Sequence, residues 1–153
     1  MFDEVKLGSH AQLWQELVRE AEDRTGRALD EGRESYLVFV LLRHQQDAFL
    51  LAHIQALDWL RAQEEVGTAR ADALRDVGDR CLLIAGLFPG LAERRRVSVD
   101  YFIDLGRGAY GEVAQCSRAG YADLFERLAQ SYYDLVRVLR AVRPESAILP
   151  RLR

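Results

Sequence analysis

The sequence contains very little lysine, cysteine and proline. Lys6 is the single lysine among 21 basic side chains, which excludes chemistry that needs a lysine elsewhere in the chain. The two cysteines, Cys81 and Cys116, have no C-x-x-C spacing and no histidine nearby, so we interpret both as small core side chains in a reducing compartment. No run of about 18 uncharged apolar residues occurs, and the amino end lacks a secretory pattern. We therefore expect a cytoplasmic protein that does not enter a membrane.

The length and composition are those of one ordinary globular domain. The 153 residues are 49% hydrophobic and 29% charged, which is enough for a core that needs neither disulfides nor a metal. The net charge of −3 is too small to identify a partner. We expect a single helical domain over residues 1–143. Residues 144–153 hold two of the three prolines, and we expect them to form an extended basic arm.

Apolar residues recur at three- and four-residue steps through most of the chain, which predicts an all-α fold. The run 36–42 is apolar on every side, but no second strand is available to pair with it, so we interpret it as helix. Six helices follow from the caps and breakers: Ser9 to Gly26, Asp30 or Glu31 through the run 36–42, Asp47 to Gly67, Thr68 to Pro89, Val99 to about Ser117, and Tyr121 to Pro144. Short links between them favour an antiparallel bundle or an orthogonal helical array.

Residues 105–113 contain the most conspicuous motif, G-x-G-x-x-G-x-V, at Gly106, Gly108, Gly111 and Val113. This string resembles the glycine-rich loop of protein kinases, in which a strand lysine downstream reaches the nucleotide phosphates. No lysine follows Gly111, and the H-R-D and D-F-G motifs are absent, so the kinase interpretation fails. The dinucleotide-binding interpretation needs a strand and a parallel sheet, which the surrounding helical pattern does not supply.

If residues 99–117 form one helix, its interior glycines cost about 1 kcal/mol each relative to alanine. We predict that close packing against a neighbouring helix or an aromatic ring offsets this cost; the alternative is a break in the helix near 106–111. The same segment is our candidate small-ligand site. Its residues are Gly106, Arg107, Gly108, Tyr110 and Gly111.

Histidines and carboxylates give no clear catalytic or metal-binding pattern. On a continuous helix His44 and His53 lie on opposite sides, and we interpret the pair His44 and Asp47 as residues at helix ends. We expect the aspartates at 72, 76 and 79, and those at 100 and 104, to lie on solvated helix faces, because arginines alternate with them. No catalytic residue, metal ligand or cofactor is predicted.

Adjacent aromatic side chains are the best indication of a partner surface. Tyr101-Phe102 and Tyr132-Tyr133 cannot both point inward on one helix, so we expect one of each pair on a second buried face or an exposed surface. A basic patch at Arg94, Arg95 and Arg96 could bind phosphates. The overall pI of about 5.7, however, is far below that of typical nucleic-acid binders.

These observations lead to three hypotheses about function. The first is a non-enzymatic helical interaction or regulatory module, a bacterial cytoplasmic protein that self-associates or binds a protein partner through the paired aromatics. The second is a small-ligand-binding protein, or an enzyme without a recognisable motif, with a pocket beside Gly106–Gly111. The third, weaker hypothesis is nucleic-acid binding through Arg94–Arg96.

Overall fold

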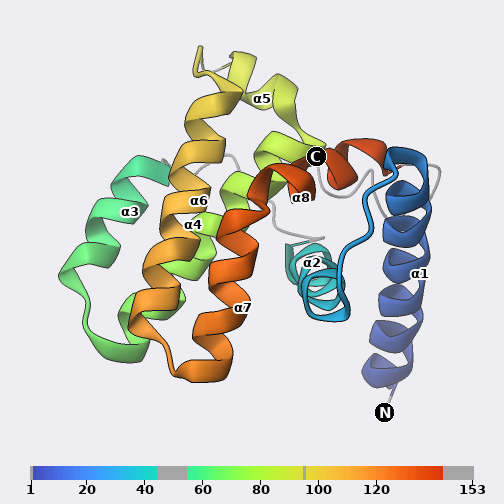
Figure 1. Ribbon diagram of the computed structural model, residues 1–153, viewed down its shortest axis with the longest axis horizontal. Helices are drawn as coiled ribbons and strands as arrows, with labels where there is room; N and C mark the ends of the chain where they lie inside the picture. Colours follow the sequence, from blue (N-terminus) through green and yellow to red (C-terminus); the bar gives the residue numbers. More distant parts are fainter. Residues whose placement is uncertain (1, 45–54, 95, 143–153) are drawn as a thin grey trace.

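The computed structural model describes residues 2–44, 55–94 and 96–142, and every regular element in these ranges is an α-helix (Figure 1). This confirms the all-α class. The helices are α1 (Phe2–Thr25), α2 (Glu31–His44), α3 (Gln55–Glu64), α4 (Gly67–Leu87), α5 (Pro89–Arg94), α6 (Val99–Cys116), α7 (Ala119–Gln130) and α8 (Tyr132–Ala141). None of these helices, within the ranges given, is long and apolar enough to cross a membrane.

Local signals set several helix ends as predicted. Gly26 follows α1 with a φ of 68°, a conformation that costs glycine little. At the start of α2 the Asp30 carboxylate accepts the backbone N–H of Arg33 at 2.9 Å. The Ser98 hydroxyl caps α6 by accepting the N–H of Asp100 at 3.1 Å. Two residues named in the sequence analysis, the predicted cap Asp47 and His53, lie outside the described residues.

The described residues contain more helices than the six predicted. The last predicted helix is divided at Ser131, whose hydroxyl donates to the Arg127 carbonyl at 2.7 Å and whose φ and ψ are −104° and 18°. A serine hydroxyl that bonds the preceding turn in this way favours a bend. The expected link after α4 contains the short helix α5, which begins at Pro89, a residue suited to the first helical position. Helix α1 also begins at Phe2, ahead of the predicted cap Ser9.

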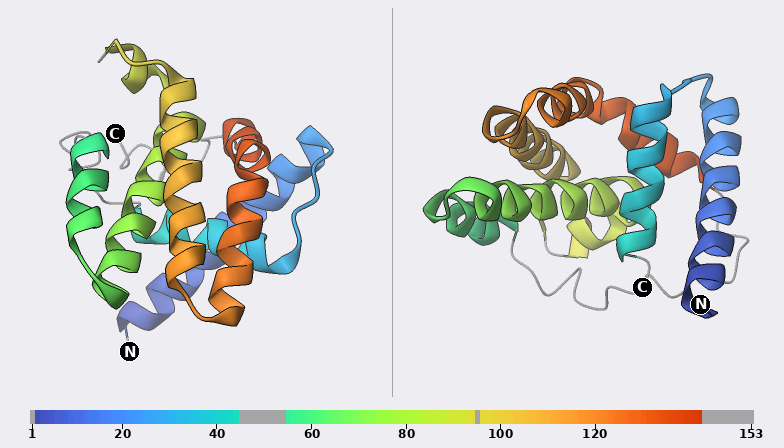
Figure 2. Two further views of the ribbon diagram at one scale, coloured as in Figure 1. Left: turned by 60° about the vertical axis from the view of Figure 1, so that its left-hand side comes forward. Right: turned by 90° about the horizontal axis from the view of Figure 1, so that it is seen from below.

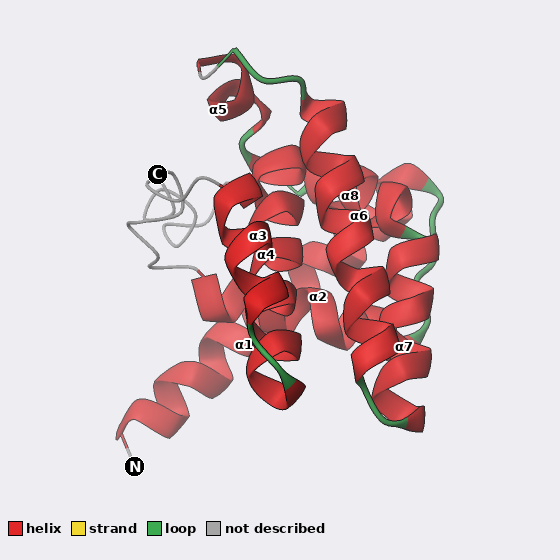
Figure 3. Ribbon diagram, turned by 90° about the vertical axis from the view of Figure 1, so that its left-hand side faces the viewer, coloured by secondary structure: helices red, strands yellow, loops and turns green. Residues whose placement is uncertain are grey.

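Helix α4 lies at the centre of the fold. It packs against α6, α3 and α8, while α1 packs against α2 and α8 (Figure 1). In Figure 1 α2 is seen nearly end-on while α6 and α7 run in the plane of the picture, so α2 crosses them at a steep angle. The view from below in Figure 2 shows α1 beside α2, with α2 between α1 and α4. Figure 3 shows α3 on the outer side of α4.

Helix α6, Val99–Cys116, continues across its glycines, as predicted for the segment 99–117. At Gly106 an added Cβ would lie 2.9 Å from the Cβ of Cys81 and would overlap the hydroxyl of Tyr132. At Gly78 of α4 an added Cβ would overlap the ring of Tyr110. These two glycines allow the close contact of α4, α6 and α8. This close packing is the contact that we predicted would offset the cost of glycine inside a helix. Gly108 has no neighbouring atom within 4 Å of a Cβ and makes no such contact.

Candidate functional site

A buried carboxylate joins three helices in the middle of the molecule. Asp79 of α4 is fully buried, and its Oδ1 accepts hydrogen bonds from the hydroxyl of Tyr36 on α2 at 2.7 Å and from that of Tyr110 on α6 at 2.6 Å. Hydrogen bonds to a carboxylate are among the stronger ones in proteins. Both donors come from distant parts of the chain, so this contact fixes how α2, α4 and α6 pack.

The second oxygen of Asp79, Oδ2, makes no hydrogen bond within the described part of the chain. It lies 3.7 Å from Nη1 of Arg43 and 3.9 Å from Nε2 of His44, both near the end of α2. The same Arg43 nitrogen lies 2.8 Å from Oδ1 of Asp76 on α4. Arg43 therefore compensates the negative charges of two carboxylates, the half-buried one of Asp76 and the fully buried one of Asp79.

The tyrosines around Asp79 act as hydrogen-bond donors. Burial, followed by the charge of Asp79, raises the pKa of Tyr36 and of Tyr110 well above the usual range. Tyr132 of α8 donates to the backbone carbonyl of Gly78 at 2.8 Å, and its burial raises the pKa of its hydroxyl in the same direction. All three hydroxyls thus remain protonated near neutral pH, which suits them to a structural role in the core.

The rings of these tyrosines belong to a continuous row of aromatic side chains. Tyr36 and Phe125 are 5.2 Å apart between centroids, and Tyr110 lies 5.4 Å from both Phe125 and Tyr132. At one end Phe39 packs on Tyr36 at 5.8 Å, and at the other Tyr121 stacks on Phe125 at 5.6 Å. We call these six side chains the aromatic row: Phe39, Tyr36, Tyr110, Tyr132, Phe125 and Tyr121.

The two ends of the aromatic row reach the surface. Phe39 on α2 is 44% exposed and Tyr121 on α7 is 59% exposed, whereas the other four rings are buried. Each exposed ring packs against one member of the contact between Tyr36 and Phe125, where α2 meets α7. The exposed rings therefore flank a single helix contact, and we call them the aromatic surface.

The residues of the predicted glycine-segment site point in different directions. Gly106 is covered by Tyr132, and Tyr110 is fully buried beside Asp79. Arg107 is exposed and pairs with Asp104 at 3.3 Å. Gly108 and Gly111 have no atom within 4 Å of the position of a Cβ. The structure therefore does not bring these residues together around one cavity.

The paired aromatics are divided between core and surface, as the sequence analysis expected. Phe102 is only 8% exposed and Tyr132 is fully buried, whereas Tyr101 is 42% and Tyr133 is 48% exposed. The guanidinium of Arg137 lies 5.6 Å from the centre of the Tyr133 ring. Only Tyr101 and Tyr133 of the predicted interface are thus available to a partner, and their role stays a prediction.

Two predictions about burial are wrong. Asp79 lies in the core and not on a solvated face, because its side of α4 is covered by Tyr36 and Tyr110. Cys116, the last residue of α6, is exposed, whereas Cys81 is buried as predicted and burial raises the pKa of its thiol.

Two further predictions concern charged residues: the solvated aspartates of α6 and the basic patch Arg94–Arg96. Asp100 and Asp104 are exposed, as expected. Of the predicted basic patch, Arg94 ends α5, Arg96 is exposed with a φ of 56°, and Arg95 lies outside the described residues. The patch therefore stays a prediction.

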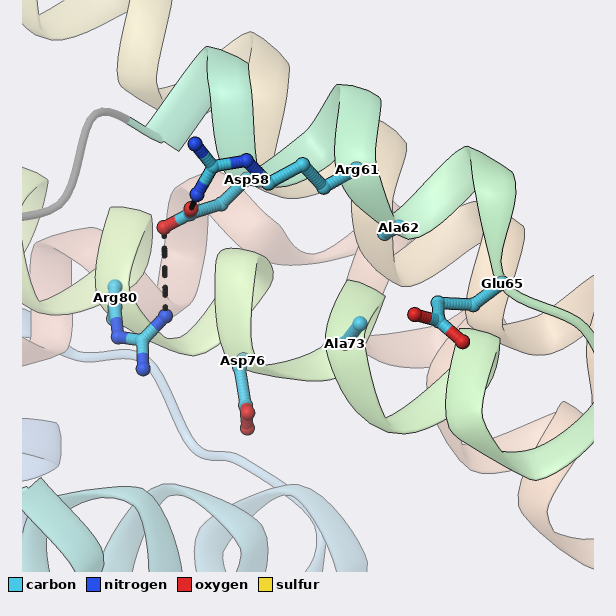
Figure 4. A pocket seen from close by; sticks show the side chains of 7 residues that line it. All are labelled: Asp58, Arg61, Ala62, Glu65, Ala73, Asp76 and Arg80. Atoms are coloured by element: carbon cyan, nitrogen blue, oxygen red, sulfur yellow. Dashed lines mark ion pairs between the residues drawn. The ribbon is translucent and has the colours of Figure 1, made fainter.

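A small pocket lies between α3 and α4, on the side of α4 away from α6 (Figure 4). Its volume is about 190 Å³, and most of its side chains are charged: Asp58, Arg61, Ala62, Glu65, Ala73, Asp76 and Arg80. No group of three or more potential metal ligands occurs among the residues the structure describes. The pocket shares Asp76 with the ion pair of Arg43.

The exposed ring of Phe39, the buried role of Asp79 and the pocket between α3 and α4 were not predicted from the sequence. The signal for Phe39 was present, because a run that is apolar on every side of a helix must leave one face outside the core. The pocket combines residues of two helices at ordinary helical spacing and leaves no motif.

No family model, curated protein or solved structure matches this chain. Function must therefore be argued from the geometry alone.

Proposed function

We propose that this chain is a non-enzymatic interaction module that self-associates through the aromatic surface of Phe39 and Tyr121. The observation that carries the proposal is the exposure of both rings, at 44% and 59%, beside one contact between α2 and α7. In this view residues 1–143 act as one helical domain, with α2 crossing the other helices as in an orthogonal array. The proposed partner is a second copy of the same chain.

The energetics of aromatic burial support this proposal. Aromatic side chains are enriched at interfaces because they bury a large apolar area with few rotatable bonds. The side chains of Phe39 and Tyr121 make no hydrogen bond or ion pair with another described residue. Their exposed area is therefore available for burial against a partner without breaking a polar contact.

The Asp79 centre, by contrast, supports a structural role over catalysis. The hydroxyls of Tyr36 and Tyr110 already donate hydrogen bonds to Asp79, and Asp79 itself is fully buried. The alternative of a ligand pocket beside Gly106–Gly111 has less support, because Tyr132 occupies the space at Gly106. Nucleic-acid binding through Arg94–Arg96 remains the weakest alternative, with no described contact that favours it.

Size-exclusion chromatography with light scattering tests the proposal. We expect the wild-type chain to have a molar mass above the monomer value of 17.4 kDa, and the double variant Phe39→Ser/Tyr121→Ser to be a monomer. Leu60→Ser is the matched control, because Leu60 is similarly exposed, at 53%, but lies on α3, outside the aromatic row and outside the predicted aromatic pairs. A wild-type chain that remains monomeric at all concentrations would contradict self-association.

A further inference from the structure

The pocket between α3 and α4 has two chemically different ends. Figure 4 shows Arg61, Arg80 and Asp58 at one end, and the carboxylate of Glu65 at the other. The methyl groups of Ala62 and Ala73 lie between these ends. The two guanidinium groups, each 3.8 Å from Asp58, are separated from the carboxylate of Glu65 by this short apolar stretch, and Asp76 also lines the pocket.

The guanidinium end retains capacity to bind an anion. Asp58 lies 3.8 Å from both Arg61 and Arg80, which is longer than a direct hydrogen bond. The Nε of Arg80 is buried without a hydrogen-bond partner in the described part of the chain. The guanidinium groups of Arg61 and Arg80 are therefore available to a ligand carboxylate, because arginine binds carboxylates through strong charge-assisted hydrogen bonds.

The opposite end of the pocket presents the exposed carboxylate of Glu65. Among the described residues, Glu65 takes part in no ion pair, whereas Asp76 already lies 2.8 Å from Arg43. Glu65 comes directly after α3, and in Figure 4 its side chain turns back toward Ala73. An ammonium group is the natural partner for such a carboxylate.

The size of the pocket limits the ligand. The volume of about 190 Å³ is below the roughly 300–1,000 Å³ of pockets for drug-sized molecules. A ligand that fits both ends must therefore be small and linear, with opposite charges separated by a few methylene groups.

We propose that this pocket binds a short ω-amino carboxylate, with the ligand carboxylate at Arg61 and Arg80 and the ligand ammonium at Glu65. The alanine methyl groups contact the methylene chain of the ligand. This binding activity is separate from self-association, because the pocket contains neither Phe39 nor Tyr121.

Isothermal titration calorimetry of the full chain with ε-aminohexanoate tests the proposal. We expect saturable binding, and affinities at least about tenfold weaker for hexanoate and for hexylamine, each of which lacks one charged contact. Glycine, whose two charges are too close together to reach both ends, should bind no better than these single-charge compounds. Equal affinity for hexanoate and ε-aminohexanoate, or no binding of ε-aminohexanoate, would overturn the proposal.

A pair of neighbouring variants locates the ammonium contact. Glu65→Gln should weaken ε-aminohexanoate about tenfold and leave hexanoate unchanged, because only the ammonium contact is lost. Glu64→Gln removes the same charge from an exposed residue that does not line the pocket, and should bind like the wild type. Both positions are exposed, so both variants should fold, and circular dichroism checks this. Equal loss in both variants would show a general charge effect and contradict the assigned site.

Discussion

The interior of the aromatic row and its two ends use the same kind of side chain for different purposes. In the interior, Tyr36 and Tyr110 are buried and their hydroxyls bond Asp79. At the ends, Phe39 and Tyr121 keep about half of their surface in solvent. The difference teaches that rings of one cluster serve two roles: the buried tyrosines hold helices together through an acceptor, and the two exposed rings, which have no such acceptor, are available to a partner.

The largest expected effect comes from removing the acceptor in the interior. Asp79→Ala leaves the hydroxyls of Tyr36 and Tyr110 buried without a partner, and should lower the free energy of unfolding by about 4 kcal/mol. Urea denaturation followed by circular dichroism measures this change.

Asp76→Ala is the control for that experiment. Asp76 is on the same helix and pairs with Arg43, but a quarter of its side chain is exposed, so the loss should be about 1 kcal/mol or less. Equal losses at the two positions would contradict a special role for the buried carboxylate.

The second largest loss of stability is expected at Gly106, where the absence of a side chain leaves space for Tyr132 of the aromatic row. Gly106→Ala places a methyl group against Tyr132 and Cys81, and should destabilise the protein by about 3 kcal/mol. Gly108→Ala, two residues further along α6, meets no atom and should stabilise it by up to about 1 kcal/mol, through helix propensity. Urea denaturation of both variants tests this contrast, which fails if they change stability in the same direction.

A smaller effect on stability is expected at Glu22, a residue of α1 outside the aromatic row. Glu22 accepts the N–H of Leu29 at 2.7 Å and lies beside Glu34; burial first, and then Glu34, raise the pKa of Glu22 from 4.5 to about 7. Between these values the folded chain holds a proton that the unfolded chain releases, so stability should fall as the pH rises from about 4.5 to 7.

Thermal unfolding at several pH values measures this dependence. In Glu22→Gln the decline in stability between pH 4.5 and 7 should be reduced, because the titrating carboxyl is gone. An unchanged pH profile in the variant would rule out Glu22 as its source.

Much of the fold could be predicted because its signals are local. The cap at Ser98 and the glycine after α1 are read from a few adjacent residues. The division at Ser131 depends on a hydroxyl that bonds one backbone carbonyl, and the apolar periodicity continues through it unchanged.

The candidate site could not be predicted in the same way. Asp79 meets its donors across 43 and 31 residues of sequence, so nothing near it in the chain distinguishes it from a solvated aspartate such as Asp72. The pocket depends equally on how α3 is placed on α4. Packing between distant helices decides both features, and helical periodicity does not encode that packing.

The smallest expected effect on stability is at the ends of the row. Phe39→Ser and Tyr121→Ser should each change the free energy of unfolding by about 1 kcal/mol or less, because both rings are already half in solvent. Urea denaturation checks this, and a loss comparable to that of Asp79→Ala would mean that these rings belong to the core.

Light scattering of the wild type and the double variant Phe39→Ser/Tyr121→Ser, at equal concentrations, tests the central claim most directly. We expect a wild-type mass above 17.4 kDa that falls to the monomer value in the variant, while the control Leu60→Ser stays associated. A wild type and a double variant of the same mass would contradict it.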